Sequence, residues 1–132
     1  MIPFRLTAQP GIPIYEQAVY AATRAIVTGQ MRVGDAFPSV RTVSRELKIN
    51  PNTAHKVIAQ LLSDGLLESR PGVGTVVARR PGSTSSERAA LLSRRIEELV
   101  VEAKRLSIDQ DEVIAAIERH WRRLSNREEA HK

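Results

Sequence analysis

The sequence contains no cysteine in 132 residues. Disulfide bonds and thiolate metal sites are therefore excluded, and a reducing compartment is compatible with the composition. No apolar run approaches the roughly 18 residues that a membrane span needs. The N-terminal stretch, residues 1–13, also lacks the charged-then-apolar pattern of a signal peptide. We therefore expect a cytoplasmic protein with no membrane partner.

Residue groupings that support catalysis or metal binding are also missing. The three histidines, His55, His120 and His131, are scattered, and no Ser/His/Asp or paired-carboxylate arrangement accompanies them. The acidic run 109–112 lacks the glycine and the spacing of a calcium loop, so it is better explained as a helix N-terminus. The sequence predicts no enzyme, no metal and no cofactor.

Positive charge is concentrated in the first part of the chain. The net charge is +5, and residues 1–80 hold ten basic against five acidic side chains, whereas residues 81–132 hold ten of each. A basic domain followed by a neutral, heavily charged tail is typical of a nucleic-acid reader with a protein-facing appendage.

Residues 37–65 have the pattern of a helix-turn-helix. Ser39 is a suitable cap for a helix that ends near Leu47, and Asn50-Pro51 starts a second helix of about fourteen residues, which Gly65 stops. The second helix has an apolar face and, opposite it, a polar face. The apolar face consists of Ala54, Val57, Ile58, Leu61 and Leu62, and the polar face of Asn52, Thr53, His55, Lys56 and Gln60.

A β-hairpin is predicted directly after these helices. Two β-prone runs, 66–70 and 75–78, flank the tip Pro71-Gly72-Val73-Gly74, whose glycines permit positive φ values. Arg70, Arg79 and Arg80 surround the hairpin with positive charge. This composition suits a wing that lies along a phosphate backbone.

The N-terminal segment is predicted to be scaffold. Residues 1–12 form an extended arm, with Ile2, Phe4 and Leu6 packed against the domain. Pro13 opens a helix that runs to about Thr28. Its inward positions are Tyr15, Ala18, Val19, Ala22 and Ile26.

The tail is predicted to contain two amphipathic helices after a linker at 81–86. A capping box of Thr84 and Glu87 starts a helix that runs to about Leu106, and Asp109 with Glu112 caps another to about Leu124. Residues 125–132 are polar, and we expect them to fray. A hairpin of this size does not bury both apolar stripes on itself well.

A second copy of the chain is the economical partner for these stripes. The sequence therefore predicts a four-helix arrangement across a two-fold axis, with Trp121 as an anchor. The alternative is that the tail folds back on its own winged helix. The predicted interface comprises Leu92, Ile96, Leu99, Ala103, Leu106, Val113, Ile117 and Trp121.

Four segments of the chain together carry a family resemblance. These are PIYEQ at 13–17, GDAFPSVRTVSREL at 34–47, NPNTAHKV at 50–57 and DGLLESRPGVGTVV at 64–77. They resemble the winged-helix domain of the GntR family of bacterial transcription regulators, and the short tail resembles that of its YtrA subfamily. The resemblance implies DNA contacts from Arg41, Asn50, Asn52, Thr53, His55, Lys56, Arg70 and Gly72.

Two residues depart from the family pattern. Pro51 lies where some other branches of the family have a base-reading arginine, which leaves open which residues set the sequence specificity. Asn50 is not such a departure, and it is equally well explained as a helix cap or as a phosphate contact. Lys48 occupies a turn position where glycine is common, which predicts an adjusted backbone.

The predicted fold class is mainly α with a small β-hairpin. A winged helix-turn-helix domain at 1–80 and a linker at 81–86 precede a two-helix dimerisation region at 87–132. We expect a homodimeric, sequence-specific DNA-binding regulator, a repressor, on a two-fold symmetric operator of double-stranded DNA; its effector is unknown. The alternative is a winged-helix adaptor for another protein without specific DNA readout.

Overall fold

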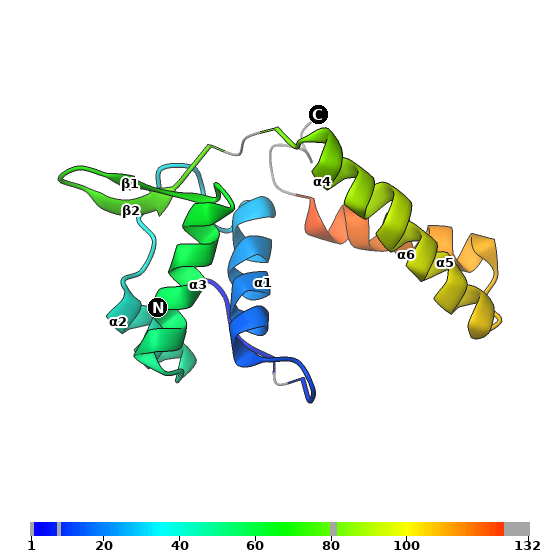
Figure 1. Cartoon of the computed structure of the whole chain (residues 1–132), viewed down its shortest axis with the longest axis horizontal. Coiled ribbons are helices and arrows are strands. Elements are labelled where there is room, and N and C mark those ends of the chain that lie inside the picture. The colour runs from blue at the N-terminus through cyan, green and yellow to red at the C-terminus, as the bar shows by residue number, and fades with distance from the viewer. Residues whose placement is uncertain (1, 8, 80–81, 126–132) are drawn as a thin grey trace. The chain divides into compact units, whose positions relative to one another are not determined.

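The computed structural model of the chain describes residues 2–7, 9–79 and 82–125. These residues divide into two units, one up to residue 79 and one from residue 82 to 125 (Figure 1). The predicted features at Arg80, at Pro81 and in residues 126–132, which include His131, lie outside the described residues. In the described ranges, no helix is long and apolar enough to cross a membrane.

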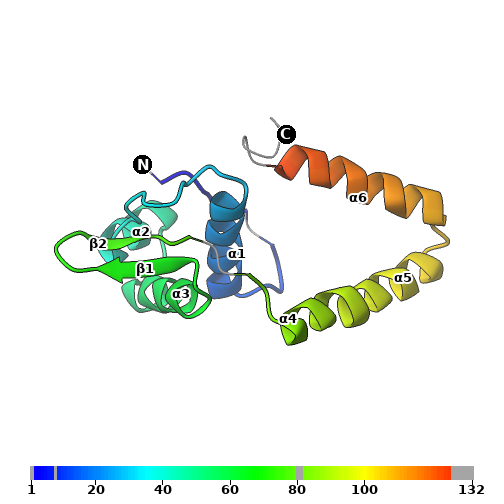
Figure 2. The same ribbon diagram turned by 90° about the horizontal axis from the view of Figure 1, so that it is seen from above.

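The first unit contains three helices and one hairpin. Helix α1 spans Ile14–Val27, α2 spans Val40–Leu47 and α3 spans Pro51–Ser63. Strands β1 (Leu67–Arg70) and β2 (Gly74–Val77) pair antiparallel, from Leu67 opposite Val77 to Arg70 opposite Gly74. In Figure 2, α2, α3 and the hairpin lie on one side of α1, and α3 packs against α1. The mainly helical fold with a small hairpin is confirmed.

The ends of α2 and α3 are fixed by local capping bonds. The Ser39 hydroxyl accepts a hydrogen bond from the Thr42 backbone N–H at 3.1 Å. Between the helices, Lys48 adopts a left-handed conformation with φ 56°, as its place in the turn predicts, and Gly65 ends α3 with φ 78°. The predicted helix-turn-helix boundaries are confirmed to within a residue or two.

The core of this unit lies where the three helices meet. Val43 of α2 and Val57 and Leu61 of α3 are fully buried. The N-terminal arm packs onto this core as predicted, since Ile2 and Phe4 are buried and the Phe4 ring stacks on Phe37 with centroids 6.0 Å apart. Burial of these apolar side chains is the main source of stability for the unit.

The second unit contains two helical arms that open into a V in Figure 2. The first arm is α4 (Ser85–Ala89), a π-helical segment η1 (Ala90–Arg95) and α5 (Ile96–Arg105); the second is α6 (Gln110–Leu124). The predicted helix from Thr84 to about Leu106 is confirmed, and it contains a π-helical segment at η1, whose wider turn rotates the residues before it relative to those after it. Helix α4 also begins inside the stretch 81–86 that was predicted as a linker.

Only one of the two predicted tail caps forms. The Thr84 hydroxyl accepts from the Glu87 N–H at 3.1 Å, and the Glu87 carboxylate accepts from the Thr84 N–H at 2.9 Å, which confirms the capping box. The prediction that Asp109 caps α6 with Glu112 is wrong, because Asp109 occupies the N-cap position without a side-chain capping bond. The acidic first turn of α6, Asp111 and Glu112, instead complements the positive end of the helix dipole.

Candidate nucleic-acid interface

Helix α3 presents a polar front because its rear is anchored in the core. Ala54, Val57 and Leu61 are fully buried at intervals of three and four residues. The opposite face is thereby turned outward, so that Asn52, His55 and Lys56 are exposed and Thr53 is half-buried. We call the outward face of the N-terminal half of α3, formed by Asn52, Thr53, His55 and Lys56, the α3 front. Its side chains offer donors and acceptors of the kind that read base edges and phosphates.

Asn50 stands immediately before the α3 front as its N-cap. Its side-chain oxygen accepts from the Asn52 backbone N–H at 2.7 Å, and its backbone carbonyl accepts from the Ala54 N–H at 3.0 Å. Pro51 takes the first helical position, where a missing N–H costs nothing. The oxygen of Asn50 is thus committed to the helix, and this capping role is the one that the structure records.

Arg41 lies in the first turn of α2, which packs against α3. Its side chain is exposed, while Val43 two residues on is fully buried. Arg41 forms no salt bridge with any residue that the structure describes. Its guanidinium is therefore available to an outside anion such as a phosphate.

Backbone hydrogen bonds fix the hairpin to the segment that leads into α2. The Phe37 N–H donates to the Thr75 carbonyl at 2.8 Å, and the Val77 N–H donates to the Asp35 carbonyl at 2.9 Å. An isolated bridge between Ala36 and Val76 lies between these bonds. The hairpin is therefore held in register with the start of α2.

The tip of the hairpin is exposed and carries a paired arginine. Gly72 has φ 76° and Gly74 φ 105°, as the predicted tight tip requires. The Arg70 guanidinium lies 2.7 Å from the Glu68 carboxylate, and each side chain is just under half exposed. Arg70 is thus placed at the wing, but Glu68 offsets its charge. The two side chains can pair because residues two positions apart on a strand point to the same face.

A polar network joins α1 to the flank of α3. The Tyr15 hydroxyl donates to the Gln60 side-chain oxygen at 2.9 Å, and the Gln60 amide donates to Asp64 at 2.8 Å. A shallow depression of about 540 Å³ lies here, lined by these first two residues with Thr53, Lys56 and Ala59. Sequence reasoning placed Tyr15 in the scaffold and Gln60 on the wet face, and it missed the bond between them because they are 45 positions apart.

The second unit leaves its predicted interface residues in solvent. Trp121 is 73% exposed and Leu92 58% exposed, and Ile96, Leu99, Leu106 and Ile117 are exposed as well. Two members of the predicted set differ: Ala103 is buried and Val113 is half-buried. Further exposed apolar residues that sequence reasoning missed are Leu91, Val100, Val101, Ile108 and Ile114. We call these exposed apolar residues of the second unit the tail apolar surface.

Shifted pKa values occur at carboxylates of the tail. Hydrogen bonds from the backbone and side chain of Thr84 lower the pKa of Glu87. The Arg105 guanidinium donates to Glu102 and lowers the pKa of that carboxyl, and Glu102 in turn raises the pKa of Arg105. These side chains are exposed and act in local helix stabilisation. Within the described ranges, no cluster of three or more His, Asp or Glu side chains is arranged to hold a metal ion.

Comparisons with known proteins point to one class of regulator. Residues 14–77 match the family described as bacterial regulatory proteins, gntR family. The chain is 28% identical over 102 residues to the HTH-type transcriptional repressor YtrA of Bacillus subtilis (strain 168), covering 76% of this chain and 78% of that protein.

Solved structures share the same fold. A structure titled transcriptional antiterminator from Listeria monocytogenes EGD-e superposes with a TM-score of 0.80 and 22% identity, over 93% of this chain and 92% of the other. The DNA-binding domain of AraR, solved in complex with operator ORX1, superposes with a TM-score of 0.51 and 25% identity, over 59% of this chain and all of the other.

Proposed function

Because residues 14–77 form a GntR-family helix-turn-helix domain, we propose that this DNA-binding transcription regulator is a repressor that binds a two-fold symmetric site as a homodimer. The single observation that carries the proposal is the α3 front, a polar and exposed helix face held by a fully buried rear. A helix so mounted can enter the major groove without disturbing its own core.

The proposed DNA contacts come from three adjoining elements. Asn52, His55 and Lys56 project from the α3 front, Arg41 projects from α2, and Gly72 lets the hairpin tip approach a phosphate backbone closely. The superposition on the AraR domain, which was solved with its operator, supports this use of the fold. Thr53 is half-buried and Asn50 caps α3. These two residues would position the backbone of α3 on the DNA and would add no charge.

Arg70 would contact a phosphate only by exchanging its partner. Its guanidinium is bonded to Glu68 in the free chain, and an exposed pair of this kind is worth little. A DNA phosphate would therefore displace Glu68 from the Arg70 guanidinium at little cost in free energy. Glu68 would also keep the wing from binding any polyanion indiscriminately.

The tail apolar surface is the proposed dimer interface. An isolated chain leaves Trp121, Leu99 and Ile117 exposed, and an accumulation of large exposed apolar side chains supports an interaction surface here. A second copy supplies a matching surface by symmetry, and a two-fold axis would present two α3 fronts to two half-sites. The similarity to the repressor YtrA supports repression by occupancy of the operator, and a regulator of this kind would act in the cytoplasm, where the chromosome is.

Selection of bound sequences from random duplex DNA tests the proposal. We expect enrichment of a palindrome whose half-sites lie about one helical turn apart, or a multiple of it. Light scattering on the same preparation should give two chains per particle, and a salt titration on the selected site should give a steep loss of affinity. No enriched sequence, or a single chain bound to an asymmetric site, would contradict the proposal.

The rival function is a protein-interaction adaptor. An adaptor's docking face usually has an apolar centre and is depleted in charge, whereas the α3 front is polar and carries Lys56. The same selection experiment separates the two functions, because an adaptor enriches no sequence.

A further inference from the structure

The shallow depression of about 540 Å³ beside α3 adjoins the α3 front. Two of its lining residues, Thr53 and Lys56, belong to the α3 front, and Ala59 and Gln60 follow them on the same helix. Tyr15 lines it from the first turn of α1, which packs against α3. We call this hollow the flank depression. It begins where the proposed base-reading face ends.

The lining residues of α3 form a ridge along one side of that helix. Thr53, Lys56 and Gln60 follow one another at intervals of three and four residues, so their side chains lie on successive turns of one face. Ala59 lies beside them in the lining. Its methyl group is short, so an outside group can come close to the backbone of α3 between the longer polar side chains.

Positive charge in the flank depression comes from Lys56. Of the described residues that line it, only Lys56 carries a formal charge. Its ammonium has no ion-pair partner in the described part of the chain, and the Thr53 hydroxyl has no hydrogen-bond partner there. Helical spacing brings these two donors onto one face, and such a pair favours an oxyanion such as a phosphate.

A chain of hydrogen bonds fixes the floor of the flank depression. The Tyr15 hydroxyl donates to the Gln60 side-chain oxygen at 2.9 Å, and the Gln60 amide donates to Asp64 at 2.8 Å. Tyr15 and Gln60 are both half-buried. The bond to Tyr15 occupies the Gln60 oxygen, an acceptor that would otherwise repel a phosphate. The same bond holds the first turn of α1 against α3.

The flank depression would meet a DNA strand when α3 occupies the major groove. A helix with its side chains is about 10–12 Å across and the groove is about 12 Å wide, so a residue beside the helix meets the phosphates at the edge of the groove. We propose that the flank depression seats one backbone phosphate of each half-site. Lys56 and Thr53 are its donors, and Tyr15 and Gln60 are positioning residues. This phosphate seat rests on the proposed DNA-binding function.

Single neutral methylphosphonate groups, placed along the selected duplex one position at a time, locate the phosphate. With the unaltered full chain, one position per half-site should raise the dissociation constant about tenfold, because a charge-assisted contact is lost. With Lys56→Ala, the same position should cost less than about twofold, because the partner of that phosphate is already missing. With Thr53→Val, which removes the second donor, the cost should fall to about threefold. Other positions should cost all three proteins the same.

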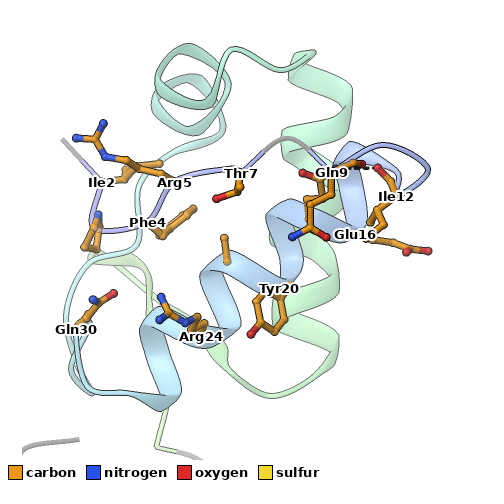
Figure 3. Close-up of a pocket in the computed structure, with 13 residues that line it drawn as sticks. Ile2, Phe4, Arg5, Thr7, Gln9, Ile12, Glu16, Tyr20, Arg24 and Gln30 are labelled. Atoms are coloured by element: carbon orange, nitrogen blue, oxygen red, sulfur yellow. Dashed lines mark hydrogen bonds between the residues drawn. The ribbon is translucent and has the colours of Figure 1, made fainter. Parts of the chain in front are cut away.

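Removal of a single hydroxyl tests the positioning role. Tyr15→Phe keeps the ring and loses the bond to Gln60, so the cost at the seated phosphate should fall to about threefold while the costs at other phosphates stay unchanged. A general loss of stability would not change one phosphate selectively. Tyr20→Phe is the matched control on the same helix. Tyr20 is 64% exposed and lines a different hollow, the open groove between the N-terminal arm and α1 (Figure 3), so every cost should stay the same.

Two results would overturn the phosphate seat: no phosphate whose cost depends on Lys56, or a dependence on Lys56 that follows base-pair substitutions instead. Equal costs in Tyr15→Phe and the unaltered chain would overturn the positioning role. An unchanged melting temperature checks that each variant is folded. A selected duplex without a Lys56-dependent phosphate would overturn the seat and leave the proposed function standing, whereas absence of any selected duplex would overturn that function and the seat with it.

Discussion

The two units of this chain treat their apolar side chains in opposite ways. In the first unit, Val43, Val57 and Leu61 are fully buried, and a hairpin and an arm close around them. In the second unit, Ala103 is the buried apolar residue within the described range, and Trp121 and Leu92 are mostly exposed. Both units have amphipathic helices, so the helical pattern alone does not decide whether an apolar stripe finds its partner within the chain.

The difference indicates where each unit obtains its stability. In the first unit, α3 packs against both α1 and α2, and apolar residues of all three helices join one buried cluster. The second unit has two arms that open away from each other, so their stripes face solvent in a single chain. A unit of the first kind carries its own core, and we propose that the second unit gains its core by association with a second copy. The predictions below test this contrast, from the largest expected effect to the smallest.

Truncation of the first unit's core should have the largest effect. Leu61→Ala removes a fully buried side chain and should cost about 2–5 kcal/mol in the free energy of unfolding. Leu62→Ala, one position on and 37% exposed, is the matched control and should cost less than about 1 kcal/mol. Urea denaturation followed by circular dichroism measures both, and equal costs would show that the first unit does not depend on this core.

Disruption of the tail apolar surface should separate the subunits without unfolding the first unit. Leu99→Glu with Trp121→Ala should weaken dimerisation by about 2 kcal/mol or more, since large aromatic anchors dominate interfaces. Sedimentation equilibrium measures the dissociation constant. Glu97→Gln, an exposed polar change on the same helix, should leave the dimer intact. A dimer that survives the double change would place the interface elsewhere.

Loss of positive charge at Arg41 of α2 or at Lys56 of the α3 front should weaken DNA binding while both units stay folded. Arg41→Ala and Lys56→Ala should each lower the affinity for the selected site by about 1–2 kcal/mol and reduce the salt dependence by about one phosphate contact. Fluorescence anisotropy at several salt concentrations measures both quantities. Lys104→Ala, an exposed change in the tail, serves as the control; unchanged affinity for both Arg41→Ala and Lys56→Ala would remove the helix-turn-helix face from the mechanism.

Relief of the left-handed turn should stabilise the first unit slightly. Lys48 holds φ 56° between α2 and α3, and glycine tolerates this conformation without the Cβ clash. Lys48→Gly should therefore raise the free energy of unfolding by up to about 1 kcal/mol, the strain relieved exceeding the entropy lost. Arg45→Gly, inside α2 and exposed, should instead lower it by about 1 kcal/mol. Thermal unfolding measures both changes. If both substitutions raised, or both lowered, the free energy of unfolding, the account of the turn would be contradicted.

The smallest effect is the weakening of the Thr84–Glu87 capping box at acidic pH. The pKa of Glu87 is lowered in the folded chain by its bonds to Thr84, so its contribution is present above the pKa of the unfolded state and is lost as the pH falls through the lowered folded pKa. Helicity of the tail should therefore decline slightly below about pH 4.5. Glu87→Gln retains a capping partner and should remove this decline, whereas Glu118→Gln on α6 should not; a decline of the same size in Glu87→Gln would assign it to other groups.

The features that were predictable from sequence are mainly local ones. Capping by Ser39, Asn50 and Thr84 depends on neighbours within three residues, and the adjusted backbone at Lys48 follows from its place in a tight turn. The periodicity of α3 likewise determined its polar front, because buried and exposed positions alternate with the helical repeat. The roles of these residues in DNA binding remain predictions.

The features that sequence reasoning missed depend on distant partners or on small energy differences. The Tyr15–Gln60 bond joins residues 45 positions apart, and the open groove between the N-terminal arm and α1 forms only when the arm packs against that helix. The missing cap bond at Asp109 and the π segment at Ala90–Arg95 depend on choices between conformations of similar energy. A one-dimensional pattern does not resolve such choices.

Native mass spectrometry of the chain bound to its selected duplex tests the central claim most directly. The account predicts two chains on one duplex with two half-sites, and one chain for the Leu99→Glu/Trp121→Ala variant on the same duplex at equal concentration. Two chains bound by that variant, or one chain bound by the unaltered protein, would contradict the division into a DNA-reading unit with its own core and a tail that gains its core from a second copy.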